Sequence, residues 1–412
     1  MPNLVPAVLI ESINAAAGHP RNPEGLALTT DEQVHFSSLS LRGRHRRIAA
    51  AIAALGLIVV VAACGSATAS GTGSTQESST PLSGSAGATG FPLSVTHKFG
   101  TTVIEQEPTR VVSAGYTEHD TLLSLGVIPV AVTDWYGDQP YATWPWAQDE
   151  LGDATPEVLS LADGFQFEKI AALKPDLIVA TNAGMEAEDY TKLSAIAPTV
   201  AQSGEFTDFF EPWYVQSIAI GEAVGRSAEV TELVDDVRAQ FADAAAANPE
   251  FAGVPAVFLQ NAIYDGSAIA YQKGLSTDFL TDLGFDIPSE IDAFATEGGQ
   301  AYIPVEQLAV LDNAEVLIWG TEADSDKADL EQVPLFDGLS AVQAGRSIYT
   351  GGELAAAIYF TTPLSLPYVL DSLVPQLVLN VLLTLPLYIV LRPLFARRRL
   401  TTAITREVEL VG

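Results

Sequence analysis

The stretch "FEKIAALKPDLIVA", residues 167–180, carries an acidic residue at its start, continues as an apolar helical stripe, breaks at Pro175 and ends as a short strand. The stretch "VEQLAVLDNAEVLIW", residues 305–319, repeats the same order near the other end of the chain. Each stretch predicts a helix followed by a strand. The sequence therefore predicts two halves that are built on one plan.

Both halves also begin in the same way. In the first half, "RVVSAGYTEHDTLLSLGVIPVAVTDW" (110–135) predicts a strand at 111–114, a helix at 118–125 and a strand at 130–133. In the second half, "PAVFLQ" predicts a strand and "TDFLTDLGFDI" predicts a helix that ends before Gly284. Strands that alternate with helices indicate a mostly parallel α/β sheet in each half. We expect two pseudo-symmetric lobes of this α/β class.

One long helix is predicted between the lobes. The segment "SAEVTELVDDVRAQFADAAAANPEF" places its apolar residues on one face at helical spacing: Val230, Leu233, Val234, Val237 and Phe241. A helix of about 20 residues spans about 30 Å, roughly the width of one domain. We expect the first lobe at 91–212, the interlobe helix at 213–250 and the second lobe at 251–372.

The N-terminal part of the chain reads as an export signal. A basic segment, "RGRHRR" (42–47), precedes an uncharged apolar run that ends at "VAAC", so 42–63 is interpreted as a lipoprotein signal peptide. Cys64 is the predicted lipidation site, and a buried free thiol is the alternative. Residues 64–90 are rich in Ser and Gly and predict a flexible tether. Residues 1–41 are interpreted as a disordered prefix or a mis-annotated start.

The composition excludes several functions. The chain has 51 acidic and 20 basic residues, so its surface is a poor match for nucleic acid. A single Cys excludes an internal disulfide, and no pair of its five His has the spacing of zinc ligands. No Ser/His/Asp arrangement or Gly-rich phosphate loop is visible, and the adjacent His119 and Asp120 are better explained by a helix start. We therefore expect that the chain is not an enzyme.

These parts, in this order, resemble the ferric siderophore and vitamin B12 substrate-binding proteins of ABC importers. The segments "DWYGDQPYATWPWAQDELGDATPEVL" and "LSLPYVLDSLVPQL" resemble the actinobacterial iron–siderophore branch. The resemblance covers about 91–377. It implies a monomeric class III substrate-binding protein on the extracytoplasmic face of the bacterial cell membrane, which delivers a ferric siderophore to an ABC permease dimer.

The resemblance also gives a reason for the repeated acidic residue. In this family each lobe presents one surface Glu to an Arg cluster on the permease dimer, and the matching positions here are Glu168 and Glu306. The alternative is a local role, because a carboxylate in the first turn of a helix is stabilised by the helix dipole.

The ligand is expected in a cleft between the lobes, at the carboxyl ends of the strands, where aromatic residues gather. The candidate ligand-binding residues are Trp135, Tyr136, Trp144, Trp213, Tyr271, Tyr302, Arg346 and Phe360. Few cationic residues are near these segments, which favours a neutral or cationic ferric hydroxamate over a tris-catecholate. The siderophore holds the iron, so the resemblance implies no protein ligand to the metal and no cofactor.

The last segment, 373–412, does not match the family. Residues 373–391 are uncharged and are followed by Arg residues, which is typical of a membrane span; completion of the last soluble helix, a fused fragment and a reading-frame artefact are the alternatives. Two other functions stay open at this point. The same fold could bind cobalamin or haem, and the tail alone would fit a membrane-anchored envelope protein without a transport role.

Overall fold

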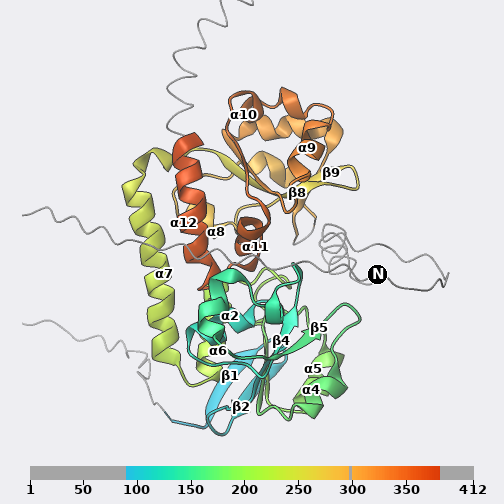
Figure 1. Cartoon of the computed structure of the whole chain (residues 1–412), viewed down its shortest axis with the longest axis vertical. Helices are drawn as coiled ribbons and strands as arrows, with labels where there is room; N and C mark the ends of the chain where they lie inside the picture. The colour runs from blue at the N-terminus through green and yellow to red at the C-terminus, as the bar shows by residue number, and fades with distance from the viewer. Residues whose placement is uncertain (1–89, 297–298, 381–412) are drawn as a thin grey trace, which may run out of the picture. The chain divides into compact units, whose positions relative to one another are not determined.

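The structure, a computed structural model, describes residues 90–296 and 299–380, all within one compact unit (Figure 1). The predicted prefix, signal peptide and lipidated Cys64 lie outside these residues. So do all of the tether except its last residue, and the chain after 380. The predictions for those segments are not tested by the fold.

The first half is built on a parallel five-stranded sheet, preceded by a hairpin of β1 (Leu93–His97) and β2 (Gly100–Ile104). Its strand order is β5-β4-β3-β6-β7, and every neighbouring pair is parallel. The strands are β3 Val111–Ser113, β4 Ala131–Asp134, β5 Glu157–Ser160, β6 Leu177–Ala180 and β7 Thr199–Ala201. The helices of this half are α2 Glu118–Ser124, α3 Gln148–Leu151, α4 Phe167–Ala172 and α5 Ala187–Ser194, with 3₁₀ turns η1 Pro140–Ala142 and η2 Pro145–Ala147.

The second half contains a mixed five-stranded sheet in the order β10-β9-β8-β11-β12. The strands β8, β11 and β12 are parallel, whereas β9 runs antiparallel to both of its neighbours. The strands are β8 Ala256–Tyr264, β9 Ser267–Ala270, β10 Ala301–Pro304, β11 Val316–Gly320 and β12 Ser347–Tyr349. The helices are α8 Asp278–Thr281, α9 Asp326–Glu331, α10 Ser340–Gln343, α11 Gly352–Phe360 and α12 Ser365–Val378, with 3₁₀ segments η3 Pro249–Phe251, η4 Ser289–Phe294, η5 Val305–Asn313 and η6 Phe336–Gly338. The predicted mostly parallel α/β fold is confirmed.

Both faces of each sheet are covered around its central strands, which explains why β6 (LIVA) and the VLIW run of β11 are apolar without a break. In β8 and β11, Phe258 and Ile318 pack toward α7, α11 and α12, whereas Leu259 and Trp319 pack toward η5, α9 and α10. Successive strand side chains point to opposite faces, so a sheet with two covered faces needs an unbroken apolar run.

One of the two repeated helices differs from its prediction. Residues 167–172 form the α-helix α4, but residues 305–313 form the 3₁₀ segment η5, so an α-helix there was wrong. Val305, Leu308 and Leu311 all pack on the same apolar cluster. Their spacing of three residues matches the three residues per turn of a 3₁₀ helix and places them on one face.

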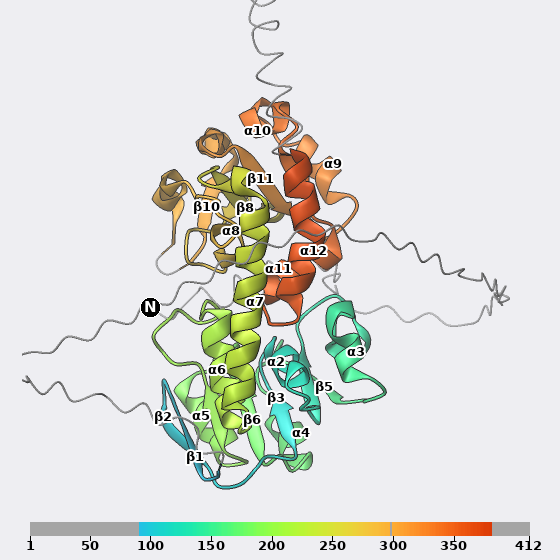
Figure 2. The same ribbon diagram turned by 90° about the vertical axis from the view of Figure 1, so that its left-hand side faces the viewer.

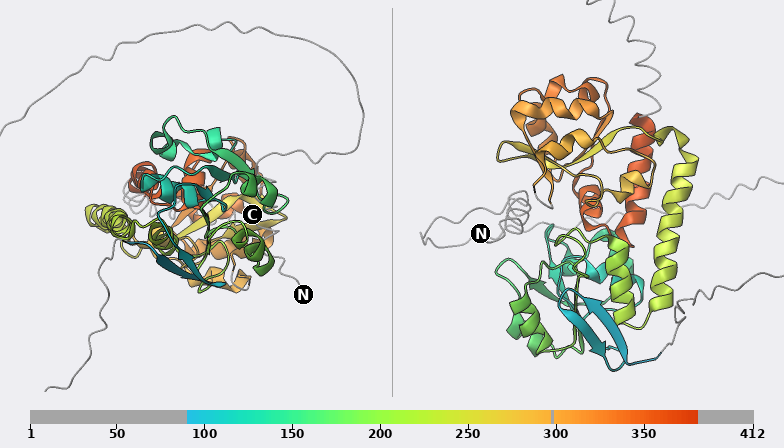
Figure 3. Two further views of the ribbon diagram at one scale, coloured as in Figure 1. Left: turned by 90° about the horizontal axis from the view of Figure 1, so that it is seen from below. Right: turned by 180° about the vertical axis from the view of Figure 1, so that it is seen from behind.

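Two helices connect the halves where one segment was expected. Helix α6 (Trp213–Ala223) is followed by α7 (Ser227–Ala247), whose 21 residues span about 30 Å. The buried face of α7 consists of Val230, Val234, Val237 and Phe241. Figures 2 and 3 show α7 running along both halves, with α12 beside its upper part.

The C-terminal apolar segment begins inside the core. Leu373 and Leu377 of α12 are fully buried in the cluster that includes Val237 and Phe241 of α7. Within 90–296 and 299–380, no helix has both the length and the apolar character that a membrane crossing requires. The part of the predicted span that is described therefore completes the last helix of the unit, and residues 381–391 lie outside the described range.

Candidate functional site

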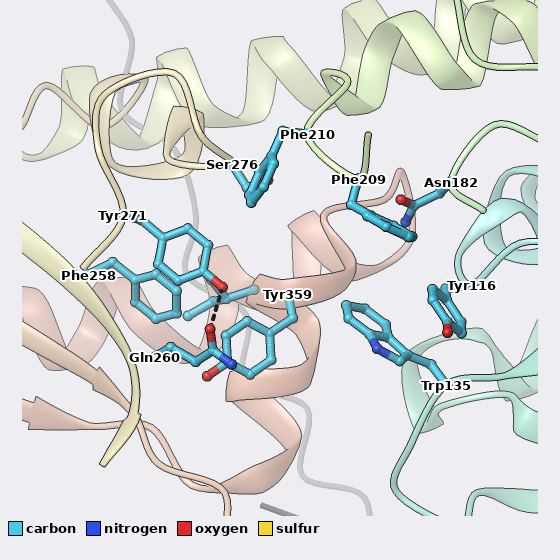
Figure 4. Close-up of a pocket in the computed structure, with 11 residues that line it drawn as sticks. Tyr116, Trp135, Asn182, Phe209, Phe210, Phe258, Gln260, Tyr271, Ser276 and Tyr359 are labelled. Carbon is cyan, nitrogen blue, oxygen red and sulfur yellow. Dashed lines mark hydrogen bonds between the residues drawn. The ribbon is translucent and has the colours of Figure 1, made fainter. Parts of the chain in front are cut away.

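A pocket, which we call the main pocket, lies at the carboxyl ends of the central strands of both sheets. Its volume, with the space open to solvent included, is about 640 Å³. Residues from both halves line it: Tyr116, Trp135, Asn182, Phe209, Phe210, Phe258, Gln260, Tyr271, Ser276, Ile358 and Tyr359 (Figure 4). Parallel α/β sheets bind ligands at this edge, because the loops that follow the strands meet there.

The first half supplies a stack of rings. Tyr116 follows β3 and stacks on Trp135, which follows β4, with 5.3 Å between ring centroids. Phe209 also stacks on Tyr116, at 6.1 Å. Buried Glu118 fixes this wall, since its Oε1 accepts a hydrogen bond from the backbone N of Asn182 at 2.7 Å. Burial raises the pKa of Glu118 to about 7, and the backbone hydrogen bonds that it accepts oppose that rise.

The second half supplies hydroxyl and amide groups. Tyr271 Oη donates to Oε1 of Gln260 at 3.2 Å, and Tyr359 Oη donates to the carbonyl of Gly320 at 3.1 Å. The backbone N of Asn261 donates back to Tyr359 Oη at 3.2 Å. These bonds hold two tyrosine rings and one amide against the pocket (Figure 4).

The pocket is uncharged at neutral pH. None of the described residues that line it is Lys, Arg, Asp or Glu. Burial raises the pKa of Tyr116 to about 12, with a smaller contribution from Asp134, and burial also raises the pKa of Tyr271 and Tyr359. The tyrosines are therefore neutral. The buried Oδ1 of Asn182 has no hydrogen-bond partner among the described residues, which leaves one acceptor for a ligand.

Two further spaces adjoin this pocket, one smaller and one larger than it. One shares Asn182, Phe209 and Tyr359 with it and adds Trp213 and Phe360. The other, which we call the side pocket, is lined by Tyr136, Gly137, Asp138, Gln139, Trp144, Pro145, Glu322, Ala323, Gly352 and Glu353. The candidate residues thus divide among three neighbouring spaces between the halves.

A buried carboxylate joins the two halves behind the rings. Asp120 of α2 is 0% exposed, and its Oδ2 accepts hydrogen bonds from Trp146 Nε1 at 2.8 Å and from Thr362 Oγ1 at 2.5 Å. Burial raises the pKa of Asp120, and the adjacent His119 opposes the rise. His119 is buried as well, and both residues lie in the first turn of α2, as expected for a helix start. The ring of His119 also meets Phe360 of α11 edge-on, with 6.1 Å between ring centroids, so the pair contacts both halves.

The profile of a known family, described as periplasmic binding protein, matches residues 111–354. The chain belongs to this family. Its members are substrate-binding proteins of transporters, so the predictions of a binding protein and against an enzyme are confirmed.

Solved and curated periplasmic binding proteins resemble the chain over most of their own length. A periplasmic solute binding protein from Mycobacterium smegmatis is 48% identical with a TM-score of 0.66, and the match covers 70% of this chain and 98% of that one. PiaA of Streptococcus pneumoniae, solved with ferrichrome, is 25% identical with a TM-score of 0.60 over 70% and 98%. YhfQ of Bacillus subtilis, provisionally named an ABC transporter substrate-binding lipoprotein, is 27% identical over 61% and 79%.

Among the predicted ligand-binding residues, Trp135 and Tyr271 line the main pocket, and Trp213, Phe360, Tyr136 and Trp144 line the adjoining spaces. The structure does not bring the other two there. Tyr302 lies on β10 at the sheet edge. Arg346 lies just before β12, at the amino ends of the strands, where its Nη1 donates to Glu315 at 2.7 Å.

Several lining residues were missed by the sequence reasoning, although a signal existed for some. Tyr116 and Asn182 each follow a predicted strand within a few residues. Trp135 was predicted as a ligand-binding residue because it has the same position after a strand. Phe258 and Gln260 lie within β8 and carried no such signal.

The two repeated acidic residues are both exposed. Glu168 is in the first turn of α4 and Glu306 is in the first turn of η5. Neither carboxylate forms an ion pair with another described residue. Both are free to contact a partner, one from each half.

Proposed function

We propose that this periplasmic binding protein captures a ferric siderophore in the main pocket and delivers it to an ABC importer. The observation that carries the proposal is the ring-lined pocket, to which both halves contribute at the carboxyl ends of their sheets. The two halves then act as lobes that hold the ligand between them. PiaA, whose solved complex contains ferrichrome, supports the ligand class.

The charge of the pocket supports a ferric hydroxamate. A ferric tris-catecholate carries three negative charges, and burying them without Arg or Lys would cost several kcal/mol. A ferric trihydroxamate is neutral at its metal centre and presents carbonyl oxygens and methylene chains. Such a surface suits aromatic walls with neutral hydroxyl donors. Among the described residues, no group of His, Cys, Asp or Glu is arranged to hold a metal ion, so the iron stays in its chelator.

Tryptophan fluorescence titration tests this function, because Trp135 lies in the wall of the pocket. We expect ferric hydroxamates to quench the emission of the purified protein with a Kd of about 1 μM or lower, which corresponds to about −8 kcal/mol. A ferric catecholate, cobalamin and haem form the comparison set. Saturable binding of cobalamin or haem without binding of any ferric hydroxamate would refute the proposed ligand.

The location and the partner follow from the same proposal. We infer that Cys64 is lipidated and holds the protein at the extracytoplasmic face of the cell membrane; the segment "VAAC" after an apolar run supports this, as does the provisional lipoprotein name of YhfQ. We infer that Glu168 and Glu306 contact the permease dimer, which their exposure and their presence in both halves support.

A further inference from the structure

The side pocket lies beside the main pocket and has a volume of about 970 Å³ with the space open to solvent included. Tyr136 connects the two, because its ring lies 5.3 Å from Trp135 and 6.4 Å from Tyr359, both of which line the main pocket. Gly137 has a φ of +93°, and a Cβ there would lie 2.4 Å from the ring of Trp144. A glycine is therefore needed for this loop to hold the indole against the side pocket.

Two polar atoms at the side pocket are buried without a partner. Tyr136 is 8% exposed, and its Oη has no hydrogen-bond partner among the described residues. The same holds for Oε1 of Glu322. An unsatisfied buried donor or acceptor is costly, so these two atoms point to a ligand group that reaches them.

The charge of the side pocket is negative. Three acidic residues line it: Glu322 and the exposed Asp138 and Glu353. No Lys or Arg is among its described lining residues. The N-terminus of α11 at Gly352 contributes about half a positive charge, which three carboxylates outweigh. Tyr136 and Trp144 add aromatic rings to the lining, and such rings attract organic cations. The metal-ion alternative is disfavoured, since no described group of acidic residues has metal-holding geometry.

We propose that the side pocket binds a cationic ammonium arm of the siderophore while the ferric hydroxamate core occupies the main pocket. This inference rests on the proposed function and adds a substrate class to it: chelates with a protonated amine at one end. The ammonium group donates to Glu322 and to Tyr136 Oη. The rings of Tyr136 and Trp144 cover the methylene chain that leads to it.

The test compares two probes on the full-length chain by tryptophan fluorescence. Ferrioxamine B is a linear ferric trihydroxamate with a terminal ammonium group, and in its N-acetylated form a neutral acetamide replaces that group. We expect Glu322→Gln to weaken binding of ferrioxamine B about tenfold, the size of one charge-assisted hydrogen bond, and to change binding of the acetylated form less than about twofold. Glu290→Gln, an exposed acid of η4, is the matched control for net charge.

The pH dependence gives a second readout. Burial raises the pKa of Glu322 to about 7, and the nearby Asp326 adds to this. The other ionisable groups that face it are Asp138, Glu353 and the tyrosines Tyr136, Tyr271 and Tyr359, whose hydroxyls stay protonated. Protonation of Glu322 removes the partner of the ammonium group. The wild-type preference for ferrioxamine B over its acetylated form should therefore be larger at pH 8 than at pH 6, and Glu322→Gln should abolish this difference.

The outcomes separate the two proposals. Equal binding of both probes to the wild type, or equal losses for both in Glu322→Gln, would overturn the side-pocket inference and leave the proposed function standing. Failure of both probes, and of every other ferric hydroxamate, to bind the wild type would refute the proposed function itself.

Discussion

Replacing Glu168 and Glu306 together by Ala is expected to abolish uptake of the ferric siderophore by cells. The Kd of the purified variant for the ferric siderophore should stay within about twofold of the wild-type value. Both residues are exposed, and neither lines the pocket. An exposed ion pair contributes about 0–1 kcal/mol, but a pair that is desolvated on docking can contribute about 2–5 kcal/mol. Losing two such pairs, one on each side of a two-fold permease, would prevent productive docking. Uptake of radiolabelled ferric siderophore by cells whose only copy carries the variant measures the effect.

A control must remove the same charge elsewhere. Glu150 of α3 and Glu290 of η4 are exposed acids, one in each half, and neither has an ion-pair partner among the described residues. Replacing both by Ala should leave uptake unchanged. Normal uptake by the Glu168→Ala, Glu306→Ala variant would show that these residues are not part of the docking surface. An equal loss of uptake in the control would show that the effect comes from net charge alone.

Replacing Asp120 by Ala is expected to lower the free energy of unfolding by about 2–4 kcal/mol. The change leaves the Nε1 of Trp146 and the hydroxyl of Thr362 without their acceptor in a buried place, and each unsatisfied group costs about 1–3 kcal/mol. The change also removes the cost of burying the carboxylate, which offsets part of that loss. Urea denaturation followed by circular dichroism measures the change.

The matched control is Asp149→Ala, an exposed acid on α3, which should shift the free energy of unfolding by less than about 0.5 kcal/mol. Because Asp120 joins the halves next to Trp146, its loss should also weaken ligand binding. A variant that is as stable as the wild type would show that Asp120 does not hold the halves together.

The order of strands and helices could be predicted because the apolar patterns are long. The buried face of α7 repeats from Val230 to Phe241, over about three turns, and the runs at β6 and β11 are unbroken because both faces of each sheet are covered. The type of the 305–313 segment was missed because periods of 3.0 and 3.6 residues differ little over nine residues. Only the packing of Val305, Leu308 and Leu311 on one cluster decides between them.

The site was predicted only where sequence position carries the information. Trp135 follows the parallel strand β4, and loops after parallel strands meet at one edge. Tyr271 instead follows the antiparallel strand β9, so that rule does not explain its place in the pocket. Arg346 was chosen for its charge, although it precedes a strand and therefore lies at the opposite edge. The bond between Asp120 and Thr362 joins residues 242 positions apart, and no local pattern in the sequence indicates such a contact.

A crystal structure of the full chain with a ferric trihydroxamate, with anomalous data collected at the iron absorption edge, tests the central claim most directly. The iron peak is expected in the space between Trp135 and Tyr271, with all six ligand atoms from the chelator and the nearest protein atoms belonging to the ring walls. An iron peak on the outer surface, or one coordinated by carboxylates of the protein, would contradict the account.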